Sequence, residues 1–143
     1  MSPSDLLSVA EQFGAPVYVY DAEKITAQYN RLGQAFSQVP SVRLNYAVKA
    51  LNNISILRLM NHLGSGLDTV SIQEVQLGIK AGFDPKNIIF TPNGVSLEEL
   101  EQAATLGVQI NIDNLSLLEQ FGSKHPQIPV CVRINPHVLA GGN

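Results

Sequence analysis

Two kinds of hydrophobic pattern alternate along most of the chain. Short runs of apolar and β-branched residues predict strands, and longer stretches with an apolar residue every three or four positions predict amphipathic helices. Successive strands begin about 20 residues apart, which is typical of compact βα units. The predicted strands cover residues 42–48, 66–70, 87–91, 108–112 and 129–134, and the helices that follow the first four cover residues 53–63, 72–81, 96–106 and 114–121.

The chain ahead of this repeat has a pattern of its own. Residues 6–13 predict a helix that ends at Gly14. Residues 16–20 are rich in valine and tyrosine and predict a strand. Asp21 is a suitable N-terminal cap for a second helix, which is expected to run to about Phe36 with its apolar residues on one face.

Helix boundaries in the repeat carry recognisable signals. A Ser-x-x-Glu sequence forms a capping box, in which each side chain accepts a hydrogen bond from the other residue's backbone. Two such sequences are present, Ser71 to Glu74 and Ser96 to Glu99. Glycine commonly ends a helix because it adopts the left-handed conformation without strain. The glycines predicted to do so are Gly64, Gly82, Gly107 and Gly122.

Polar residues lie within the predicted strands or at their carboxyl ends. They are Asp68, Asn111, Asp113, Arg133 and Asn135. Repeated strand–helix alternation predicts an α/β fold with helices flanking parallel strands, and polar carboxyl ends are typical of the functional face of a (β/α)8 barrel. A complete TIM-type barrel needs about 250 residues. The chain of 143 residues is therefore predicted to be a fragment with about the first five strands of such a barrel.

Composition narrows the range of partners. A hydrophobic content of 45% and a net charge of −3 are typical of a globular domain, and no basic cluster favours nucleic acid or an anionic membrane. No apolar run approaches the roughly 20 residues of a membrane span, and the N-terminus lacks the pattern of a secretion signal. Cys131 is the only cysteine. It excludes an intramolecular disulfide, is predicted to lie in the core, and fits a cytoplasmic location.

The first strand of the repeat leads directly into Lys49, with no acidic residue nearby in sequence. An amine held at the tip of a buried strand can be partly desolvated. Desolvation disfavours the charged form of an amine and frees its lone pair for reaction with a carbonyl group. The alternative is a lysine that simply extends into solvent at a strand end, which is common. Both interpretations remain open from this segment alone.

Several local sequences then occur in a particular order. They are Tyr46-Ala47-Val48-Lys49-Ala50, Gly66-Leu67-Asp68-Thr69-Val70-Ser71-Ile72-Gln73-Glu74, Ile88-Ile89-Phe90-Thr91-Pro92-Asn93, Val108-Gln109-Ile110-Asn111-Ile112-Asp113-Asn114 and Val132-Arg133-Ile134-Asn135-Pro136. Their order and spacing, from about Phe13 to Asn143, resemble the N-terminal part of the diaminopimelate decarboxylase family. That family belongs to the fold-type III, alanine-racemase-like enzymes, which use pyridoxal 5'-phosphate (PLP).

The resemblance implies roles for individual residues. Lys49 would be the catalytic lysine that binds PLP covalently. The residues that would surround the cofactor are Lys49, Asp68, Arg133 and Tyr46. Glu74 matches a second acidic position of the family, although helix capping explains it equally well. Leu51 stands where the family usually has asparagine, and Asn52 and Asn53 follow it.

The resemblance also implies a function and an organisation. The full-length protein would be a carboxy-lyase that converts meso-diaminopimelate to L-lysine and CO2, as a homodimer with shared active sites, whereas this fragment alone would be inactive. Residues 1–21 would carry a helix and a strand that joins a C-terminal β-domain, and residues 22–143 would begin the PLP-binding barrel. The alternatives are a decarboxylase for ornithine, arginine or carboxynorspermidine, a non-catalytic PLP-binding barrel, and a plain βα scaffold.

The three histidines are not expected to form a metal site, because none has a partner at the spacing of metal ligands. His62 is expected on a helix surface and His125 in an exposed loop, whereas a place for His137 at the active-site mouth is the less favoured alternative. By resemblance, the phosphate-binding glycines and the histidine that stacks on the cofactor would lie beyond Asn143.

Overall fold

The computed structural model describes residues 1–136, which fall into two compact units, Met1–Val42 and the chain from Arg43 onward. The first unit contains two helices, α1 (Pro3–Phe13) and α2 (Ala22–Ala35), both close to their predicted positions. α1 begins earlier than predicted because Ser2 caps it in a reciprocal capping box. The predicted cap Asp21 is confirmed, since its side chain accepts a hydrogen bond from the Lys24 backbone at 3.0 Å.

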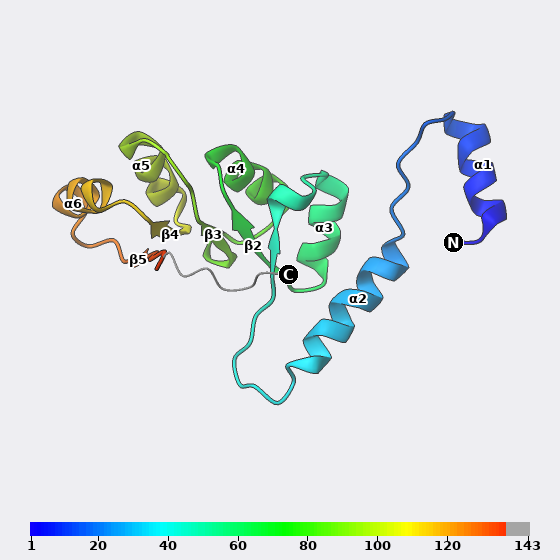
Figure 1. Cartoon of the computed structure of the whole chain (residues 1–143), viewed down its shortest axis with the longest axis horizontal. Coiled ribbons are helices and arrows are strands. Elements are labelled where there is room, and N and C mark those ends of the chain that lie inside the picture. Colours follow the sequence, from blue (N-terminus) through cyan, green and yellow to red (C-terminus); the bar gives the residue numbers. More distant parts are fainter. Residues whose placement is uncertain (137–143) are drawn as a thin grey trace. The chain divides into compact units, whose positions relative to one another are not determined.

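Residues 16–20 do not form the predicted strand. They connect α1 to α2 as irregular chain (Figure 1). A strand needs a neighbour to take up its backbone hydrogen bonds, and the first unit contains only helices besides this segment. The predicted assignment of residues 1–21 and 22–143 to separate domains concerns the full-length protein and stays a prediction.

The second unit is a five-stranded parallel sheet in which each of the first four strands is followed by helical structure (Figure 1). Its strands are β1 (Asn45–Ala47), β2 (Gly66–Thr69), β3 (Ile88–Phe90), β4 (Gln109–Ile112) and β5 (Val130–Val132), in the spatial order β1-β2-β3-β4-β5. Its helices are α3 (Ile54–His62), α4 (Ile72–Lys80), α5 (Leu97–Leu106) and α6 (Leu115–Lys124), with short 3-10 helices η1 (Val48–Ala50) and η2 (Pro85–Asn87). The predicted partial barrel is confirmed, although its strands are shorter than predicted.

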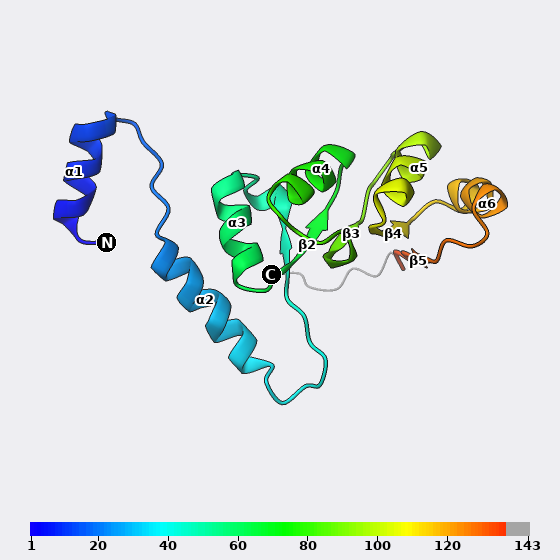
Figure 2. The same ribbon diagram turned by 180° about the vertical axis from the view of Figure 1, so that it is seen from behind.

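The two faces of the sheet differ in what covers them. Helices α3–α6 lie along one side, which Figures 1 and 2 show from opposite directions. On that side the residues of β2, β3 and β4 are buried and form the core; they include Leu67, Ile88, Phe90 and Ile110. Side chains alternate across a strand, so the intervening residues, such as Asp68 and Ile89, belong to the other face. No helix among the described residues of the second unit lies on that face.

The capping predictions are largely confirmed. Ser96 and Glu99 form a reciprocal box at the start of α5. Gly107 ends the same helix with a φ of 75°, a left-handed conformation that only glycine adopts without strain. Gly64 and Gly82 likewise have positive φ after their helices. The prediction for Gly122 is wrong, because α6 continues through it to Lys124.

Helices α5 and α6 are joined by a cluster of charged side chains. Oε1 of Glu101 lies 3.1 Å from Nε2 of His125 and 3.1 Å from Nζ of Lys124. The hydrogen bond with His125, and after it the one with Lys124, lowers the pKa of Glu101. The His125 ring also packs against Phe121, with 4.9 Å between ring centroids. His125 is therefore partly buried rather than exposed as predicted.

Candidate functional site

Lys49 lies just beyond β1, not on it. The strand ends at Ala47, and Lys49 is the middle residue of η1, a turn closed by a 3.1 Å hydrogen bond from the Leu51 N–H to the Val48 carbonyl. Val48 is buried, whereas Lys49 is exposed. No carboxylate forms an ion pair with Lys49 among residues 1–136. The amine is thus accessible from solvent, and not desolvated as it would be at a buried strand tip.

Asp68 lies on the strand next to this turn. Its position in β2 is directly opposite Ala47 of β1, and η1 contacts β2. Asp68 is partly buried on the uncovered face, and its carboxylate has no hydrogen-bond partner within the described chain. Neighbouring parallel strands point their carboxyl ends the same way. The structure therefore brings Lys49 and Asp68 to adjacent strands at one end of the sheet.

Arg133 is at the same end of the sheet but is not beside Lys49. It follows β5, and its N–H donates to the Ile112 carbonyl at 2.9 Å, which extends the ladder with β4. Strands β2, β3 and β4 lie between β1 and β5. The Arg133 side chain is exposed and lines a pocket of about 310 Å³ together with Asp113 and Asn135.

Tyr46 lies on the helix-covered side of β1. It is directly opposite Leu67, a fully buried core residue, and so belongs to the opposite face from Asp68. Its hydroxyl donates a hydrogen bond to the Leu51 carbonyl at 3.1 Å. Tyr46 thus contacts the chain that follows Lys49, and its predicted contact with a cofactor stays a prediction.

Glu74 takes part in helix capping. Its backbone N–H donates to the Ser71 hydroxyl at 3.2 Å, and its carboxylate accepts from the Val70 N–H at 2.8 Å. In a reciprocal capping box the Glu74 carboxylate would accept from the Ser71 N–H. It accepts instead from the N–H of Val70, one residue earlier. This explains Glu74 without a role in the site.

Asn111 was expected among the polar residues of the strands but not among those around the cofactor. Its Nδ2 donates to Oγ1 of Thr91 at 3.0 Å, which leaves its Oδ1 buried with no partner in residues 1–136. In register, Asn111 lies opposite Cys131, on the face that also carries Asp68. A buried acceptor is rarely left unpaired, so Asn111 is available to a ligand. In the sequence, an asparagine between two isoleucines of a predicted strand was the feature that could have indicated this.

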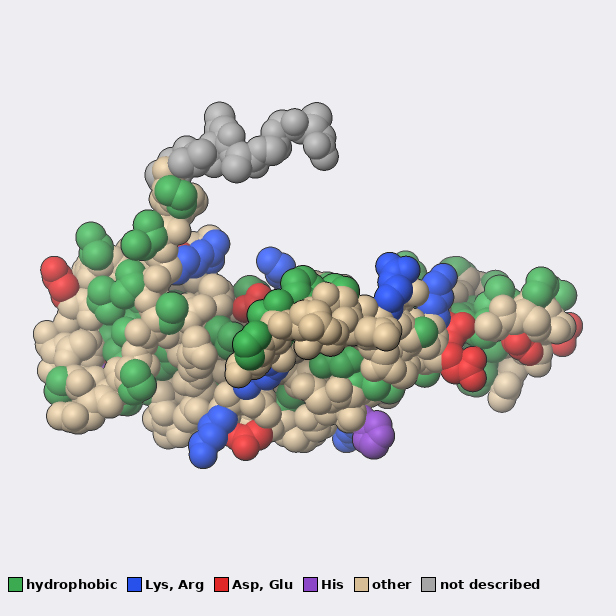
Figure 3. All heavy atoms as spheres, turned by 90° about the horizontal axis from the view of Figure 1, so that it is seen from below, with side chains coloured by type: hydrophobic (Ala, Val, Ile, Leu, Met, Phe, Trp, Pro, Cys, Tyr) green, Lys and Arg blue, Asp and Glu red, His purple; other side chains and the backbone are tan. Residues whose placement is uncertain are grey.

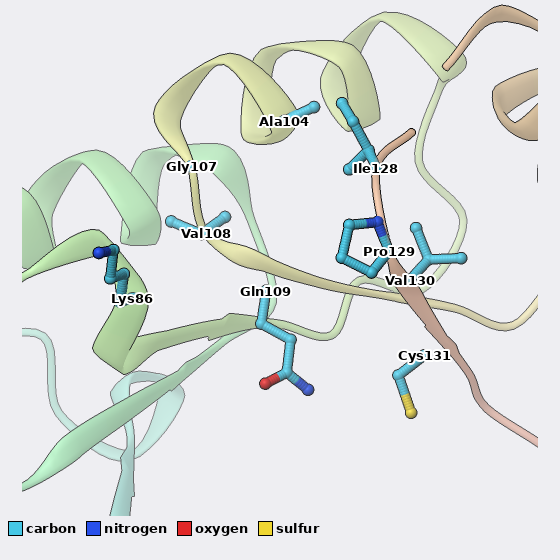
Figure 4. A pocket seen from close by; sticks show the side chains of 9 residues that line it. All are labelled: Lys86, Ala104, Gly107, Val108, Gln109, Ile128, Pro129, Val130 and Cys131. Atoms are coloured by element: carbon cyan, nitrogen blue, oxygen red, sulfur yellow. The ribbon is translucent and has the colours of Figure 1, made fainter. Parts of the chain in front are cut away.

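Cys131 is exposed, which corrects the prediction of a core residue. Figure 4 shows its side chain pointing to the same side of the sheet as Gln109, away from Ala104 of α5 and Ile128. It therefore faces the side without helices. Cys131, Gln109, Ala104 and Ile128 all border a pocket of about 570 Å³. This pocket lies at the amino ends of β4 and β5, and Lys49 lies at the opposite end of the sheet.

The residues near Lys49 suit the cofactor that the resemblance implies. An accessible amine without an ion-pair partner can react with the aldehyde of pyridoxal phosphate. Ala47, the residue opposite Asp68, has only a methyl side chain and so leaves space on this face of the sheet. The Asp68 carboxylate and the Asn111 Oδ1 are hydrogen-bond acceptors without a partner in the described chain. The residues present therefore fit the group.

Other kinds of site find no support in residues 1–136. That stretch holds no group of three histidine, cysteine or acidic residues placed to bind a metal ion. None of its helices is both long and apolar enough to cross a membrane. His137 lies outside the described residues.

Comparisons with known proteins give a consistent result. Residues 22–142 match the family described as pyridoxal-dependent decarboxylase, pyridoxal binding domain. The chain is 38% identical over 140 residues to a diaminopimelate decarboxylase of Methanothermobacter thermautotrophicus, covering 96% of this chain and 33% of that protein. It is 35% identical to that of Escherichia coli K12, covering 95% and 32%. The chain thus spans about a third of the length of these relatives.

Solved structures agree with the sequence relatives. Diaminopimelate decarboxylase of Helicobacter pylori complexed with L-lysine matches with a TM-score of 0.83 and 34% identity, over 93% of this chain and 35% of that one. A lysine/ornithine decarboxylase of Vibrio vulnificus complexed with putrescine matches with a TM-score of 0.81 and 29% identity, over 92% and 36%. Through its pyridoxal-binding domain, the chain therefore belongs to the pyridoxal-dependent decarboxylases.

Proposed function

We propose that Lys49 is the covalent anchor of pyridoxal phosphate, and that the full-length protein decarboxylates meso-diaminopimelate to L-lysine and CO2. One observation carries the proposal. An exposed lysine without an ion-pair partner in the described chain lies on a turn at the carboxyl end of β1, within the residues that match the pyridoxal-binding domain. Carboxyl strand ends are where barrel enzymes hold their active sites.

In this proposal the cofactor supplies the chemistry, and the residues of the chain bind and orient it. When bound, pyridoxal phosphate supplies the electron sink for the carbanion left as CO2 departs. Lys49 would hold the cofactor through its side-chain amine. Asp68 would offer a hydrogen-bond acceptor on the uncovered face of β2, and the Arg133 guanidinium at the carboxyl end of β5 would suit an anionic group.

The choice of diaminopimelate is supported by the sequence relatives, several of which carry that name. The second candidate is a decarboxylase for ornithine, arginine or carboxynorspermidine, which the lysine/ornithine decarboxylase among the structural neighbours favours. A homodimer with shared active sites and a cytoplasmic location belong to the same proposal, the first by family resemblance and the second because only one cysteine is present.

Reductive trapping tests the anchor. Full-length protein is loaded with pyridoxal phosphate, reduced with borohydride and digested, and the pyridoxyl label is located by mass spectrometry. We expect the label on Lys49, its loss in Lys49→Ala, and its retention in Lys80→Ala, which changes an exposed lysine at the end of α4. A label on another lysine in the wild type would refute the assignment.

The substrate is tested separately. CO2 release is measured with meso-diaminopimelate, ornithine, arginine and carboxynorspermidine. We expect the highest kcat/KM with meso-diaminopimelate. A higher value for another amino acid would support the second candidate, and no release from any of them, with Lys49 still labelled, would favour a non-catalytic PLP-binding protein.

A further inference from the structure

The turn that carries Lys49 has little intrinsic rigidity. η1 is three residues long and is closed by one backbone hydrogen bond, from Leu51 N–H to Val48 C=O. Short 3-10 turns have poorer hydrogen-bond geometry than α-helices. Only Val48 of its three side chains is buried. A catalytic amine on such a turn needs support from outside the turn if its direction is to be fixed.

Support is present on both sides of the lysine. Ahead of it, Tyr46 in β1 donates its hydroxyl proton to the Leu51 carbonyl at 3.1 Å, so that one side chain spans the whole turn. After it, Oδ1 of Asn53 caps α3 by accepting from the Ser55 N–H at 2.9 Å and, more weakly, the Ile56 N–H at 3.4 Å. The chain that follows Lys49 is thereby held at the Leu51 carbonyl and again at the start of α3.

The hydroxyl of Tyr46 donates its hydrogen bond to a backbone carbonyl, that of Leu51. The hydrogen bond therefore does not depend on the side chain at position 51, where leucine stands in place of the usual asparagine of the family. The tyrosine is on the covered side of β1 and Asp68 is on the open side. The tyrosine hydroxyl therefore acts on the turn through its backbone, at the Leu51 carbonyl.

We infer that Tyr46 is a positioning residue, whose hydroxyl holds the Leu51 carbonyl and so fixes the direction in which η1 presents the Lys49 amine. The inference rests on the proposed function, because it assumes that Lys49 anchors the cofactor. It assigns no contact between Tyr46 and the cofactor or the substrate.

The test is Tyr46→Phe in the full-length protein, with Tyr18→Phe as the matched control. Both substitutions remove one hydroxyl, and Tyr18 is exposed with no hydrogen bond among the described residues. Three quantities are measured: the rate at which added pyridoxal phosphate becomes trappable by borohydride on Lys49, the pH midpoint of the cofactor's visible absorbance, and kcat with KM.

We expect Tyr46→Phe to slow attachment about three- to tenfold, which corresponds to the loss of one hydrogen bond. The pH midpoint should be displaced and kcat should fall, with KM nearly unchanged. Tyr18→Phe should match the wild type in all three. A merely structural role for Tyr46 would lower the thermal midpoint without moving the pH midpoint of the absorbance.

The outcomes separate this inference from the proposed function. If wild type is labelled on Lys49 and Tyr46→Phe has the wild-type rate and pH midpoint, the positioning role is refuted and the proposed function stands. If wild type is not labelled on Lys49, the proposed function fails. If Tyr46→Phe does not fold, fluorotyrosine in place of Tyr46 keeps the ring and strengthens the donor, and an unchanged pH midpoint then refutes the inference.

Discussion

At the scale of single residues, the site is distinguished by polar groups that the chain itself leaves unsatisfied. The other partly buried carboxylates among residues 1–136 have partners: Asp21, Glu74 and Glu99 accept hydrogen bonds at the starts of helices, and Glu101 joins α5 to α6. Asp68 has none within residues 1–136, and Lys49 has none either. Polar groups that are not needed for the fold are the ones available to a ligand.

Asp68→Asn tests this reasoning in the full-length protein. We expect pyridoxal phosphate to dissociate about ten- to a hundredfold more readily, because a charge-assisted hydrogen bond is lost. The thermal midpoint of the cofactor-free protein should stay unchanged, since Asp68 has no partner in the described chain. Cofactor affinity is measured by equilibrium dialysis.

The control is Asp84→Asn. Asp84 caps η2 by accepting from the Lys86 N–H at 2.9 Å, and asparagine caps equally well. Cofactor affinity should therefore match that of the wild type. Equal affinity in Asp68→Asn and Asp84→Asn would contradict a cofactor role for Asp68.

At the scale of elements, the sequence best predicts those helices and strands whose position is determined by residues close to one another in the chain. All five strands and four helices of the repeat are confirmed because hydrophobic periodicity and side-chain caps act within a few residues. The candidate site was partly predictable for the same reason: Lys49 and Asp68 are recognisable from their place in these units. The hydrogen bond from Tyr46 to Leu51 was not, because it depends on a turn where a longer strand was predicted.

The incorrect predictions share a cause, which is that long-range contacts decide them. Residues 16–20 have strand-forming composition but no neighbour with which to pair. Cys131 is in an apolar run, yet strand alternation turns it to the uncovered face. Gly122 has no left-handed conformation, a Cβ built on it would meet nothing within 4 Å, and α6 continues through it to Lys124. None of these circumstances is encoded within the few residues around the position concerned.

Gly66 in β2 illustrates a close approach that only glycine allows. A Cβ at Gly66 would lie 2.9 Å from the backbone carbonyl oxygen of Asn87 and would also meet the Asn45 side chain. Gly66→Ala should destabilise the full-length protein by about 1–3 kcal/mol, the usual cost of overpacking. Chemical denaturation, followed by circular dichroism, measures this change.

Gly122→Ala is the matched control, because it is inside α6 with open space around it. Alanine should stabilise that helix by about 0.5–1 kcal/mol. Opposite signs for the two substitutions are expected. A Gly66→Ala protein as stable as the wild type would show that the carbonyl of Asn87 can move aside.

At the scale of the whole molecule, the second unit leaves apolar groups exposed. Figure 3 shows hydrophobic side chains at the surface of the face that it presents. The exposed large hydrophobic residues of the second unit include Leu115, Val132 and Ile134. The described sheet also has two outer strands, β1 and β5, each paired on one side only, and parallel sheets normally have both faces covered. Further chain in the full-length protein is expected to pack against β5 and the open face.

Cys131 can report on this packing because it faces the open side of β5. In a closed barrel that side becomes the interior, which is filled by side chains. We therefore expect the Cys131 thiol of the native full-length protein to react with a maleimide at least about tenfold more slowly than in denaturant, because labelling then requires the barrel to open. Mass spectrometry of the digested protein separates Cys131 from any other cysteine. Equal rates in the native and denatured protein would show that no further strand closes over this face, and would leave the five-stranded sheet open in the full-length protein.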